Sequence, residues 1–204
     1  MCPETQTSKR PYELRRRAET MAATRERITE AAVDLHGTVG PARTTITAVA
    51  ERAGVQRHTV YRHFPSEAEL FAACSGHFFA THPWPDPSAW RAVADPAARL
   101  TVALDDLYAY YEGTEAMLTN VLRDTGLVPA VEPALTSFRA FVDEAARALG
   151  AGWRARGQRR SVVAAAARHA VDFDTWRSLA RAGGVSRAQA VELTSAMVLR
   201  AAGR

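Results

Sequence analysis

Residues 44–71, TTITAVAERAGVQRHTVYRHFPSEAELF, decide the fold of this chain. Apolar side chains recur at helical spacing early in this stretch and give it one apolar face. They are Ile46, Val49, Ala50 and Ala53. Gly54 follows at the position where a chain leaves a helix, usually with positive φ. The stretch therefore predicts a short helix that ends in a tight turn at Gly54-Val55.

A second short helix is predicted after this turn, with apolar and polar side chains on opposite sides. Val55, Val60 and Phe64 can point inward. The outward set consists of Arg57, His58, Thr59, Arg62 and His63, with Tyr61 at the edge. An exposed helix rich in Arg, His and Thr, braced by the helix before it, suits reading of the DNA major groove. This pattern predicts a helix-turn-helix DNA-binding domain.

A third helix has a sharply marked start just after Pro65. Ser66 and Glu69 have the spacing of a capping box, in which each side chain satisfies a backbone N–H at the other position. The chain from there to the proline at position 83 has no other helix breaker than Gly76. We therefore expect a helix over residues 66–82.

The string from Ala50 to Leu70 resembles the TetR (tetracycline-repressor-like) family of transcriptional regulators. The resemblance is carried by Gly54-Val55, Thr59-Val60-Tyr61, His63-Phe64 and Ser66-x-x-Glu69-Leu70. It implies an all-α homodimer with an N-terminal three-helix DNA-binding domain and a larger C-terminal ligand-binding and dimerisation domain. The motif covers residues 20–80, and the rest of the chain is similar in length and helical character only.

The same resemblance implies which residues meet DNA. Thr45 and Thr47 stand where the family contacts phosphates or a base edge, and Tyr61 and His63 where it usually hydrogen-bonds phosphates. The full predicted set is Arg43, Thr45, Thr47, Gln56, Arg57, His58, Thr59, Tyr61, Arg62 and His63. The chain departs from the family at two positions. Gln56 stands where Ser, Thr or Asp often caps the recognition helix, and Glu67 stands where a Lys tends to bind a phosphate.

Charge is distributed unevenly along the 204 residues. Residues 1–64 hold eleven Lys and Arg against seven Asp and Glu, so the formal net charge of +4 lies entirely in this segment. A positive excess here agrees with phosphate binding. Cys2 and Cys74 do not form a disulfide framework, and no apolar run reaches the ~18 residues of a membrane span. With no apolar segment typical of a secretory signal, we expect a cytoplasmic protein.

The predicted organisation is all-α, with about nine helices, an N-terminal helix-turn-helix domain and a C-terminal helical regulatory domain. Residues 1–19 are expected to form a mobile basic arm, residues 20–82 the DNA-binding domain, and residues 83–204 the regulatory and dimerisation domain. The expected helices include 24–36, a start at Asp95-Pro96 with a restart at Gly113-Thr114, and 161–181 and 186–202 at the end.

The C-terminal helices also supply candidates for effector binding and for dimerisation. The candidate effector residues lie on apolar and aromatic stripes, which by themselves are mostly core. They are Tyr108, Tyr111, Met117, Phe138, Phe141, His169, Phe173 and Trp176. The last two helices have Ala-rich faces that allow close helix approach, so we expect the homodimer to form through them.

Other chemistry is disfavoured. His58 and His63, like His77 and His82, are five residues apart, which does not place both on one helix face for a metal. No catalytic or cofactor-binding motif is present, so we expect no metal, no cofactor and no enzyme. The prediction is a sequence-specific transcriptional regulator, a ligand-responsive repressor that binds a pseudo-palindromic duplex operator and an unknown small-molecule effector. The alternatives are a non-specific architectural DNA-binding protein and a helix-turn-helix protein that serves only as an interaction module.

Overall fold

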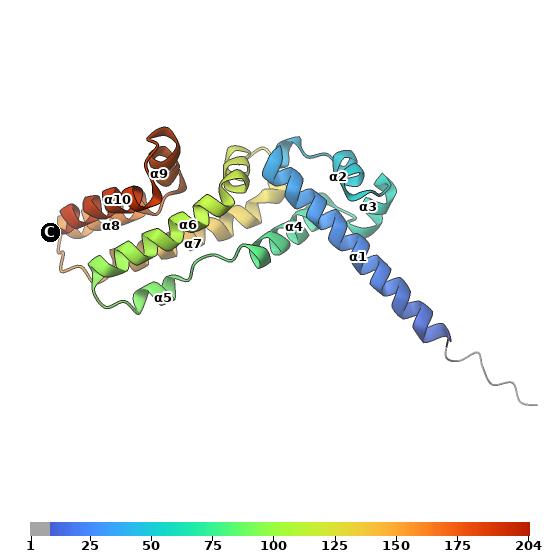
Figure 1. Ribbon diagram of the computed structural model, residues 1–204, viewed down its shortest axis with the longest axis horizontal. Helices are drawn as coiled ribbons and strands as arrows, with labels where there is room; N and C mark the ends of the chain where they lie inside the picture. Colours follow the sequence, from blue (N-terminus) through green and yellow to red (C-terminus); the bar gives the residue numbers. More distant parts are fainter. Residues whose placement is uncertain (1–8) are drawn as a thin grey trace, which may run out of the picture. The chain divides into compact units, whose positions relative to one another are not determined.

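The structure is a computed structural model that describes residues 9–204, and the described residues fold into helices and connecting loops. They divide into two compact units. Unit 1 comprises the chain up to Thr81 together with Asn120–Val131, and unit 2 comprises His82–Thr119 and Glu132–Arg204. Figure 1 labels the helices. The all-α prediction is confirmed, with ten α-helices in the described part of the chain instead of about nine.

Unit 1 holds the three-helix body that the motif predicts. Its elements are α1 (Lys9–Thr38), the 3-10 turn η1 (Pro41–Arg43), α2 (Ile46–Ala53), α3 (Arg57–His63), α4 (Glu67–Thr81) and the 3-10 turn η2 (Pro129–Val131). α1 packs against α2 and α4, and α2 packs against α3. Ile28 and Ala32 of α1, Val49 of α2, and Val60 with Phe64 around α3 are fully or almost fully buried. The predicted inward residues thus form the hydrophobic core of this unit.

α1 is much longer than the sequence predicts. The expected mobile arm over residues 1–19 is helical from Lys9 onward, and the helix also continues through Gly37. Residues 12–25 are helix formers without Gly or Pro, and Arg15 forms an ion pair with Glu19 one turn later at 2.8 Å. The part of the arm over residues 1–8 lies outside the described residues.

Short polar contacts fix where the unit 1 helices begin and end. The Thr45 side chain accepts a hydrogen bond from the N–H of Ala48 at 3.1 Å and caps α2. At the start of α4, the Ser66 hydroxyl accepts from the N–H of Glu69 at 3.2 Å and contacts the Glu69 carboxylate at 3.2 Å. The predicted helix start at Ser66 is therefore confirmed.

The segment after residue 119 ties onto the end of α1. The side-chain amide of Asn120 donates to the carbonyl oxygens of His36 at 3.2 Å and Gly37 at 2.8 Å, which are unpaired acceptors at a helix end. The carboxylate of Asp124 accepts from the N–H of Ala42 at 2.9 Å. Both polar side chains are buried, so these bonds also satisfy groups that water cannot reach.

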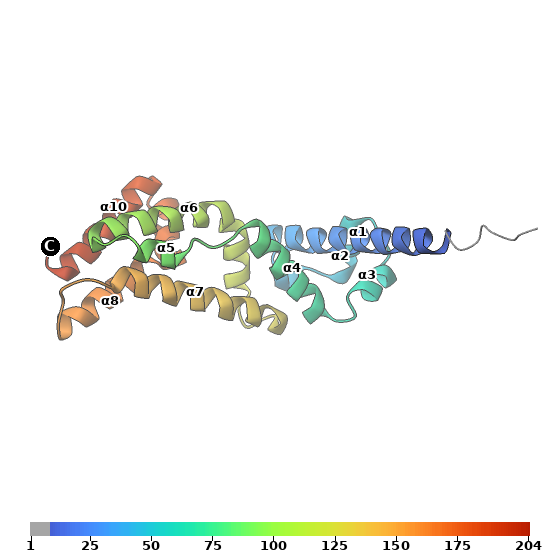
Figure 2. The ribbon, with the colours of Figure 1, turned by 90° about the horizontal axis from the view of Figure 1, so that it is seen from below.

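Unit 2 is a bundle of longer helices joined by short irregular elements. Its elements are α5 (Pro87–Arg91), most of α6 (Pro96–Arg123), α7 (Glu132–Gly150), α8 (Gln158–Ala170), α9 (Phe173–Arg177), the π-helical turn η3 (Ser178–Ala182) and α10 (Arg187–Ala202). α7 packs against α5 and α8, and α8 packs against α10; Figure 2 shows α5 beside α7.

Two expected boundaries in unit 2 differ from the structure. α6 runs without a break through Gly113, although a restart was predicted there. A glycine costs a helix interior only about 1 kcal/mol, and buried neighbours such as Tyr111 and Thr114 more than offset it. The single helix predicted over 161–181 is instead divided, because Asp172 leaves the helix and caps α9 by accepting from the N–H of Asp174 at 2.9 Å.

Two tyrosines of α6 hold the end of α8. The hydroxyl of Tyr108 donates to the carbonyl oxygen of Ala170 at 2.8 Å, and that of Tyr111 donates to Val171 at 2.7 Å. Burial raises the pKa of Tyr108 to about 12, so the phenol remains a donor. These bonds satisfy the backbone where α8 stops, which explains how the chain can turn there inside the core.

α10 begins with a capping box, at the start of the helix expected over 186–202. The Ser186 hydroxyl accepts from the N–H of Gln189 at 3.3 Å, and the Gln189 side chain accepts from the N–H of Ser186 at 2.9 Å. Within the described residues, none of the helices has both the length and the apolar character that crossing a membrane requires.

Candidate nucleic-acid interface

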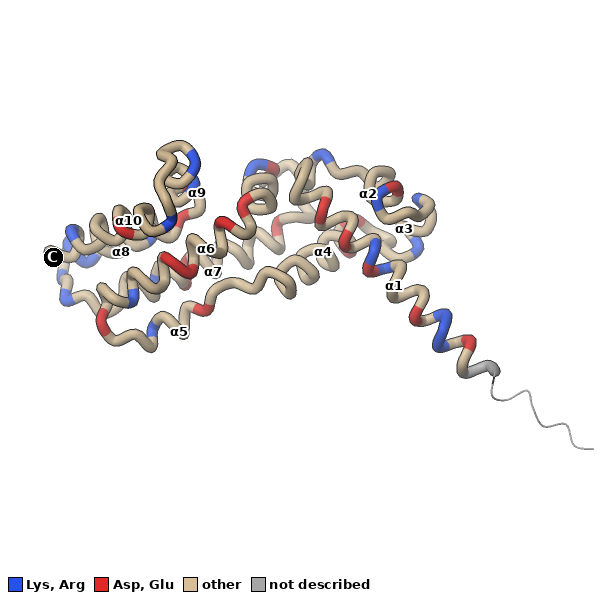
Figure 3. Tube along the Cα trace, viewed as in Figure 1, with Lys and Arg blue, Asp and Glu red and all other residues tan. Residues whose placement is uncertain are grey.

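One side of α3 is basic and exposed, and its opposite side is packed into the core of unit 1. Its seven residues include no acidic side chain (Figure 3). The exposed predicted residues of α3 are Arg57, His58, Tyr61 and Arg62, while Thr59 is half-buried. Val60 is fully buried on the opposite side. The structure thus brings together, on one short helix, side chains that can contact phosphates and base edges.

The turn between α2 and α3 depends on Gly54. Its φ of 65° and ψ of 39° lie in the left-handed region, where a side chain is disfavoured. Its N–H donates to the end of α2, and the N–H of Val55 donates to the carbonyl oxygen of Ala50 at 2.9 Å. These bonds close the last turn of α2 and set the direction in which α3 leaves.

The start of α3 lacks a side-chain cap. Gln56 occupies the N-cap position with extended backbone, and its side chain makes no capping hydrogen bond. The longer Gln side chain does not fold back onto the helix as Ser or Asp would. The exposed Gln56 amide can therefore hydrogen-bond an external partner. It lies at the N-terminal end of α3, and this is the end through which recognition helices contact base edges.

His63 differs from its predicted outward orientation, because only 8% of its surface is exposed. Burial lowers the pKa of His63, and the neighbouring positive charges of Arg62 and Arg25 lower it further. A buried imidazole has little accessible surface left for the phosphate hydrogen bond that the resemblance implies. The exposed polar face of α3 is therefore narrower than the sequence predicts, because it does not include His63.

Arg25 of α1 is a residue that the sequence reasoning missed. Its guanidinium lies 4.0 Å from the centre of the Phe64 ring and donates to the backbone carbonyl oxygen of His63. This contact places a positive charge at the C-terminal end of α3, where it complements the helix dipole. One signal was available, because Arg25 precedes Ile28 by three residues and so shares its core-facing stripe.

The other predicted contact residues lie on elements next to α3 in the chain. Thr47 and Arg43 are exposed, and Thr45 is exposed while capping α2. The positive charge of Arg43 contributes to lowering the pKa of Asp124, although the Arg123 hydrogen bond is the larger cause. Glu67 is exposed in the first turn of α4, a position that the helix dipole favours for a carboxylate.

The predicted effector residues are mostly core residues of unit 2. Tyr108, Tyr111, Phe138, Phe141, Phe173 and Trp176 are buried, and Met117 is half-buried. Tyr111, Phe173 and Trp176 form one aromatic cluster, with ring centres 5.3 to 5.8 Å apart. Their packing within the chain explains the stripe without a ligand.

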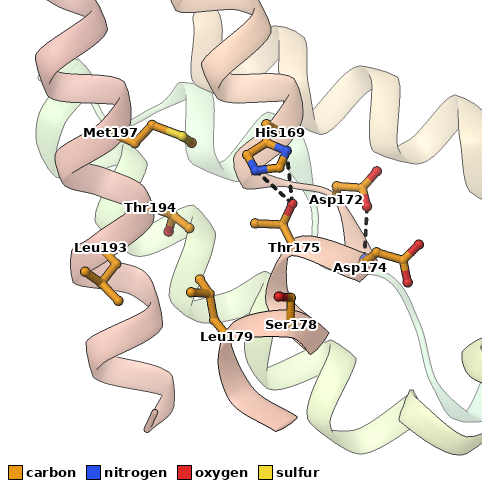
Figure 4. Close-up of a pocket in the computed structure, with 9 residues that line it drawn as sticks. All are labelled: His169, Asp172, Asp174, Thr175, Ser178, Leu179, Leu193, Thr194 and Met197. Carbon is orange, nitrogen blue, oxygen red and sulfur yellow. Dashed lines mark hydrogen bonds between the residues drawn. The ribbon is translucent and has the colours of Figure 1, made fainter. Parts of the chain in front are cut away.

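An open groove of about 420 Å³ lies elsewhere in unit 2. Its lining, drawn in Figure 4, consists of His169, Asp172, Asp174, Thr175, Ser178, Leu179, Leu193, Thr194 and Met197. His169 is thus the predicted effector residue that reaches this groove, and its ring lies 3.2 Å from the Thr175 hydroxyl. Tyr108 reaches it indirectly, since its oxygen lies 3.2 Å from the Thr194 hydroxyl. The irregular α9 and η3 elements that shape the groove have no clear periodic signal in the sequence.

Within the described residues, no group of three or more His, Cys, Asp or Glu side chains is arranged to hold a metal ion. The free thiol of Cys74 is buried, and this burial raises its pKa to about 12. The thiol therefore stays protonated and unreactive.

Comparison with known proteins shows that the helix-turn-helix region is similar to a known family. Residues 28–74 match the family described as "Bacterial regulatory proteins, tetR family". The HTH-type transcriptional regulator TtgR of Pseudomonas putida is 42% identical over 69 residues, which are 34% of this chain and 33% of TtgR. The match thus spans about a third of the length of that curated relative.

Solved structures extend the likeness over most of the chain. A putative fatty acid metabolism regulator from Clostridium perfringens superposes with a TM-score of 0.63 at 17% identity, covering 86% of this chain and 97% of that one. NalD, the secondary repressor of the MexAB-OprM multidrug efflux pump in Pseudomonas aeruginosa, gives 0.60 at 21% identity, covering 90% and 97%. At these identities the likeness shows a common fold.

Proposed function

We propose that this chain is a sequence-specific DNA-binding transcriptional regulator, because residues 28–74 match the tetR family of bacterial regulatory proteins. The observation that carries the proposal is the outward face of α3, where Arg57, His58 and Arg62 are exposed on a helix anchored by buried Val60. Arg can make bidentate contacts to guanine, each contributing ~1 to 3 kcal/mol of discrimination. The same face offers no carboxylate that would repel the duplex.

The proposed regulator acts as a homodimer on a pseudo-palindromic operator. One short recognition helix makes few base contacts, and two copies related by a two-fold axis double them. α8 and α10 are the proposed dimer surface, because they pack on each other and carry exposed apolar side chains. Val162 and Leu193 are 49% and 52% exposed. Burying such side chains against a second copy is favourable.

The proposed activity is that of a ligand-responsive repressor in the cytoplasm. NalD is a repressor, and its fold covers most of this chain. The proposed small-molecule effector binds in unit 2 and changes DNA affinity. The size of this change is limited by how much more tightly the effector binds one state of the protein, DNA-binding or non-binding, than the other. The groove around His169 is the proposed effector site among the described surfaces.

The experiment that tests this function is selection of bound sequences from a randomised duplex pool at fixed, near-physiological salt. Salt is fixed because phosphate contacts alone change affinity by orders of magnitude. A two-fold-symmetric motif is expected, and Arg57→Ala is expected to relax base preference at one position in each half-site. Arg177→Ala, an exposed arginine on α9, is the matched control and should leave the motif unchanged.

Other outcomes of the selection identify the alternatives. Tight binding without sequence enrichment would indicate an architectural DNA-binding protein. Absence of DNA binding would contradict the proposal and indicate an interaction module, in line with the uncapped Gln56 and the carboxylate of Glu67.

A further inference from the structure

A small, partly open cavity lies in unit 1, separate from the groove in unit 2. Its volume is about 210 Å³. Its walls come from the end of α1, the η1 loop, the start of α2, the first turns of α4 and the segment over residues 127–129. Apolar side chains form most of this lining, including Pro41, Ile46, Val49, Leu70 and Leu127. The cavity is therefore bounded by the elements that hold the helix-turn-helix together.

His36 gives the cavity a polar wall with an unused hydrogen-bonding group. Only 5% of its surface is exposed, and its ring stacks on Phe71 with ring centres 4.6 Å apart and planes 12° apart. Among the residues whose side chains the structure describes, no hydrogen bond reaches the His36 ring nitrogens; its backbone carbonyl bonds Asn120 instead. The His36 ring nitrogens are not among the fully enclosed polar atoms that lack a partner, so they are accessible from the pocket, where a ligand can hydrogen-bond to them.

Glu67 determines the charge that the cavity accepts. It is the one carboxylate in the described lining, and no Lys or Arg is present there. Burial lowers the pKa of His36 to about 4, so the imidazole adds no positive charge near pH 7. A cation is therefore attracted to the cavity, and an anion is repelled by it.

We propose that this cavity is a binding site for a small apolar amine, with its body against the aliphatic lining, its ammonium group facing Glu67 and an N–H within reach of His36. The volume falls below the roughly 300 to 1,000 Å³ of drug-sized sites, so the ligand is about the size of a single substituted ring. The exposed surface of the pocket is about half polar and half apolar, which suits a ligand with an apolar body and a polar group.

Occupancy of this site acts on DNA binding directly. Thr45 lines the cavity and caps α2, and Thr47 follows it on the outside of the same helix turn. A ligand between the starts of α2 and α4 biases the position of the supporting helix on which α3 rests. This regulatory step depends on the proposed function, whereas the binding step does not.

The test uses benzylamine as the probe, with benzyl alcohol and benzoate as neutral and anionic compounds of matched size. Each is titrated into the full chain near pH 7, by calorimetry and by nuclear magnetic resonance of the His imidazole protons. The His36 resonance is assigned with His36→Gln. Benzylamine should bind saturably, shift the His36 resonance and exceed benzyl alcohol in affinity, while benzoate should not bind.

Glu67→Gln isolates the charge contribution without changing the shape of the cavity. It should weaken benzylamine about three- to tenfold and leave benzyl alcohol unchanged, as expected for a partly solvated ion pair. Glu51→Gln, an exposed carboxylate on α2 outside the cavity, is the matched control and should change neither. Absence of saturable binding, equal benzylamine affinity in Glu67→Gln, or a shift of His169 in place of His36 would each overturn the proposal.

Affinity for the selected operator is then measured with and without saturating benzylamine. A change that Glu67→Gln abolishes supports regulation from this cavity. Binding of the amine without any operator binding would contradict the proposed function while leaving the site established. If the affinity for the operator were the same with and without the bound amine, the proposed regulatory step would be overturned.

Discussion

The guanidinium of Arg25 lies over the ring of Phe64, 4.0 Å from its centre, and so joins the middle of α1 to the residue that ends α3. The same guanidinium donates to the carbonyl oxygen of His63. α3 has no side-chain cap at its start, whereas its end accepts a hydrogen bond from the Arg25 guanidinium. The two ends of α3 are thus held in different ways.

Arg25→Ala should lower the free energy of unfolding by about 1 kcal/mol, since it removes a cation–π contact and a hydrogen bond from a partly solvated arginine. Urea unfolding followed by circular dichroism measures the change. Arg27→Ala, an exposed arginine two residues later, is the control and should have a smaller effect. Equal losses in the two variants would show that the Phe64 contact contributes nothing specific.

Gln56→Ser should stabilise the chain by about 0.5 to 1 kcal/mol, because Ser at an N-cap accepts from the first turn and Gln56 does not. Gln56→Ala is the companion variant and should be nearly neutral in unfolding, because no capping bond is lost. Thermal unfolding of the three proteins compares them. If Ser and Ala gave the same midpoint, the N-cap geometry of α3 would be wrong.

His36 should make stability depend on pH between about 6.5 and about 4. Burial lowers its folded pKa from 6.5 to about 4, so the unfolded chain binds the proton first as the pH falls. Stability contributed by the neutral imidazole is present above pH 6.5 and is lost on acidification, by about 3.5 kcal/mol in total at ~1.4 kcal/mol per pKa unit. Burial and nearby arginines lower the pKa of His63 too, with the same sign.

The measurement is urea unfolding at a series of pH values for the parent chain and His36→Gln. The slope of stability against pH over this window should be shallower in the variant. Parallel slopes would mean that His36 is protonated at its ordinary pKa in the folded chain.

Replacing each of two glycines by alanine should change stability in opposite directions. Gly113 lies inside α6, and a Cβ there would have no heavy atom within 4 Å, so Gly113→Ala should stabilise by about 0.5 to 1 kcal/mol. Gly40 has a φ of 97°, and a Cβ there would come within 2.7 Å of the Asp124 carboxylate. Gly40→Ala should therefore destabilise unit 1, and denaturant midpoints for the two variants should move in opposite directions.

Local sequence signals predicted the parts of the fold that depend on short-range contacts. The Gly54 turn and the cap at Ser66 involve residues three or four positions apart, so their patterns are visible in the chain. Gly113 was misread because its local preference is weak and the packing of distant residues along α6 decides the outcome. The end of α8 was missed for the same reason, since it is held by tyrosines about sixty positions earlier.

The same distinction between local and long-range contacts applies to the candidate interface and to the cavities. The exposed side of α3 follows from helical periodicity, but the burial of His63 depends on how α1 and α3 meet. Aromatic stripes in unit 2 indicate burial and cannot distinguish a core from a ligand site, and most of those residues are packed against each other. The cavity beside His36 joins five separate stretches of the chain, and no sequence pattern links them.

The aromatic cluster around Trp176 has an optical consequence. Trp176 is fully buried and its indole N–H has no hydrogen-bond partner among the described residues, so its emission should be strongly blue-shifted. All four tryptophans of the chain lie in unit 2, and unit 1 has none. Tryptophan fluorescence therefore reports on the unfolding of unit 2 alone, whereas circular dichroism reports on the helices of both units. Comparing the two signals in one denaturant series reveals whether unit 1 unfolds together with unit 2 or separately.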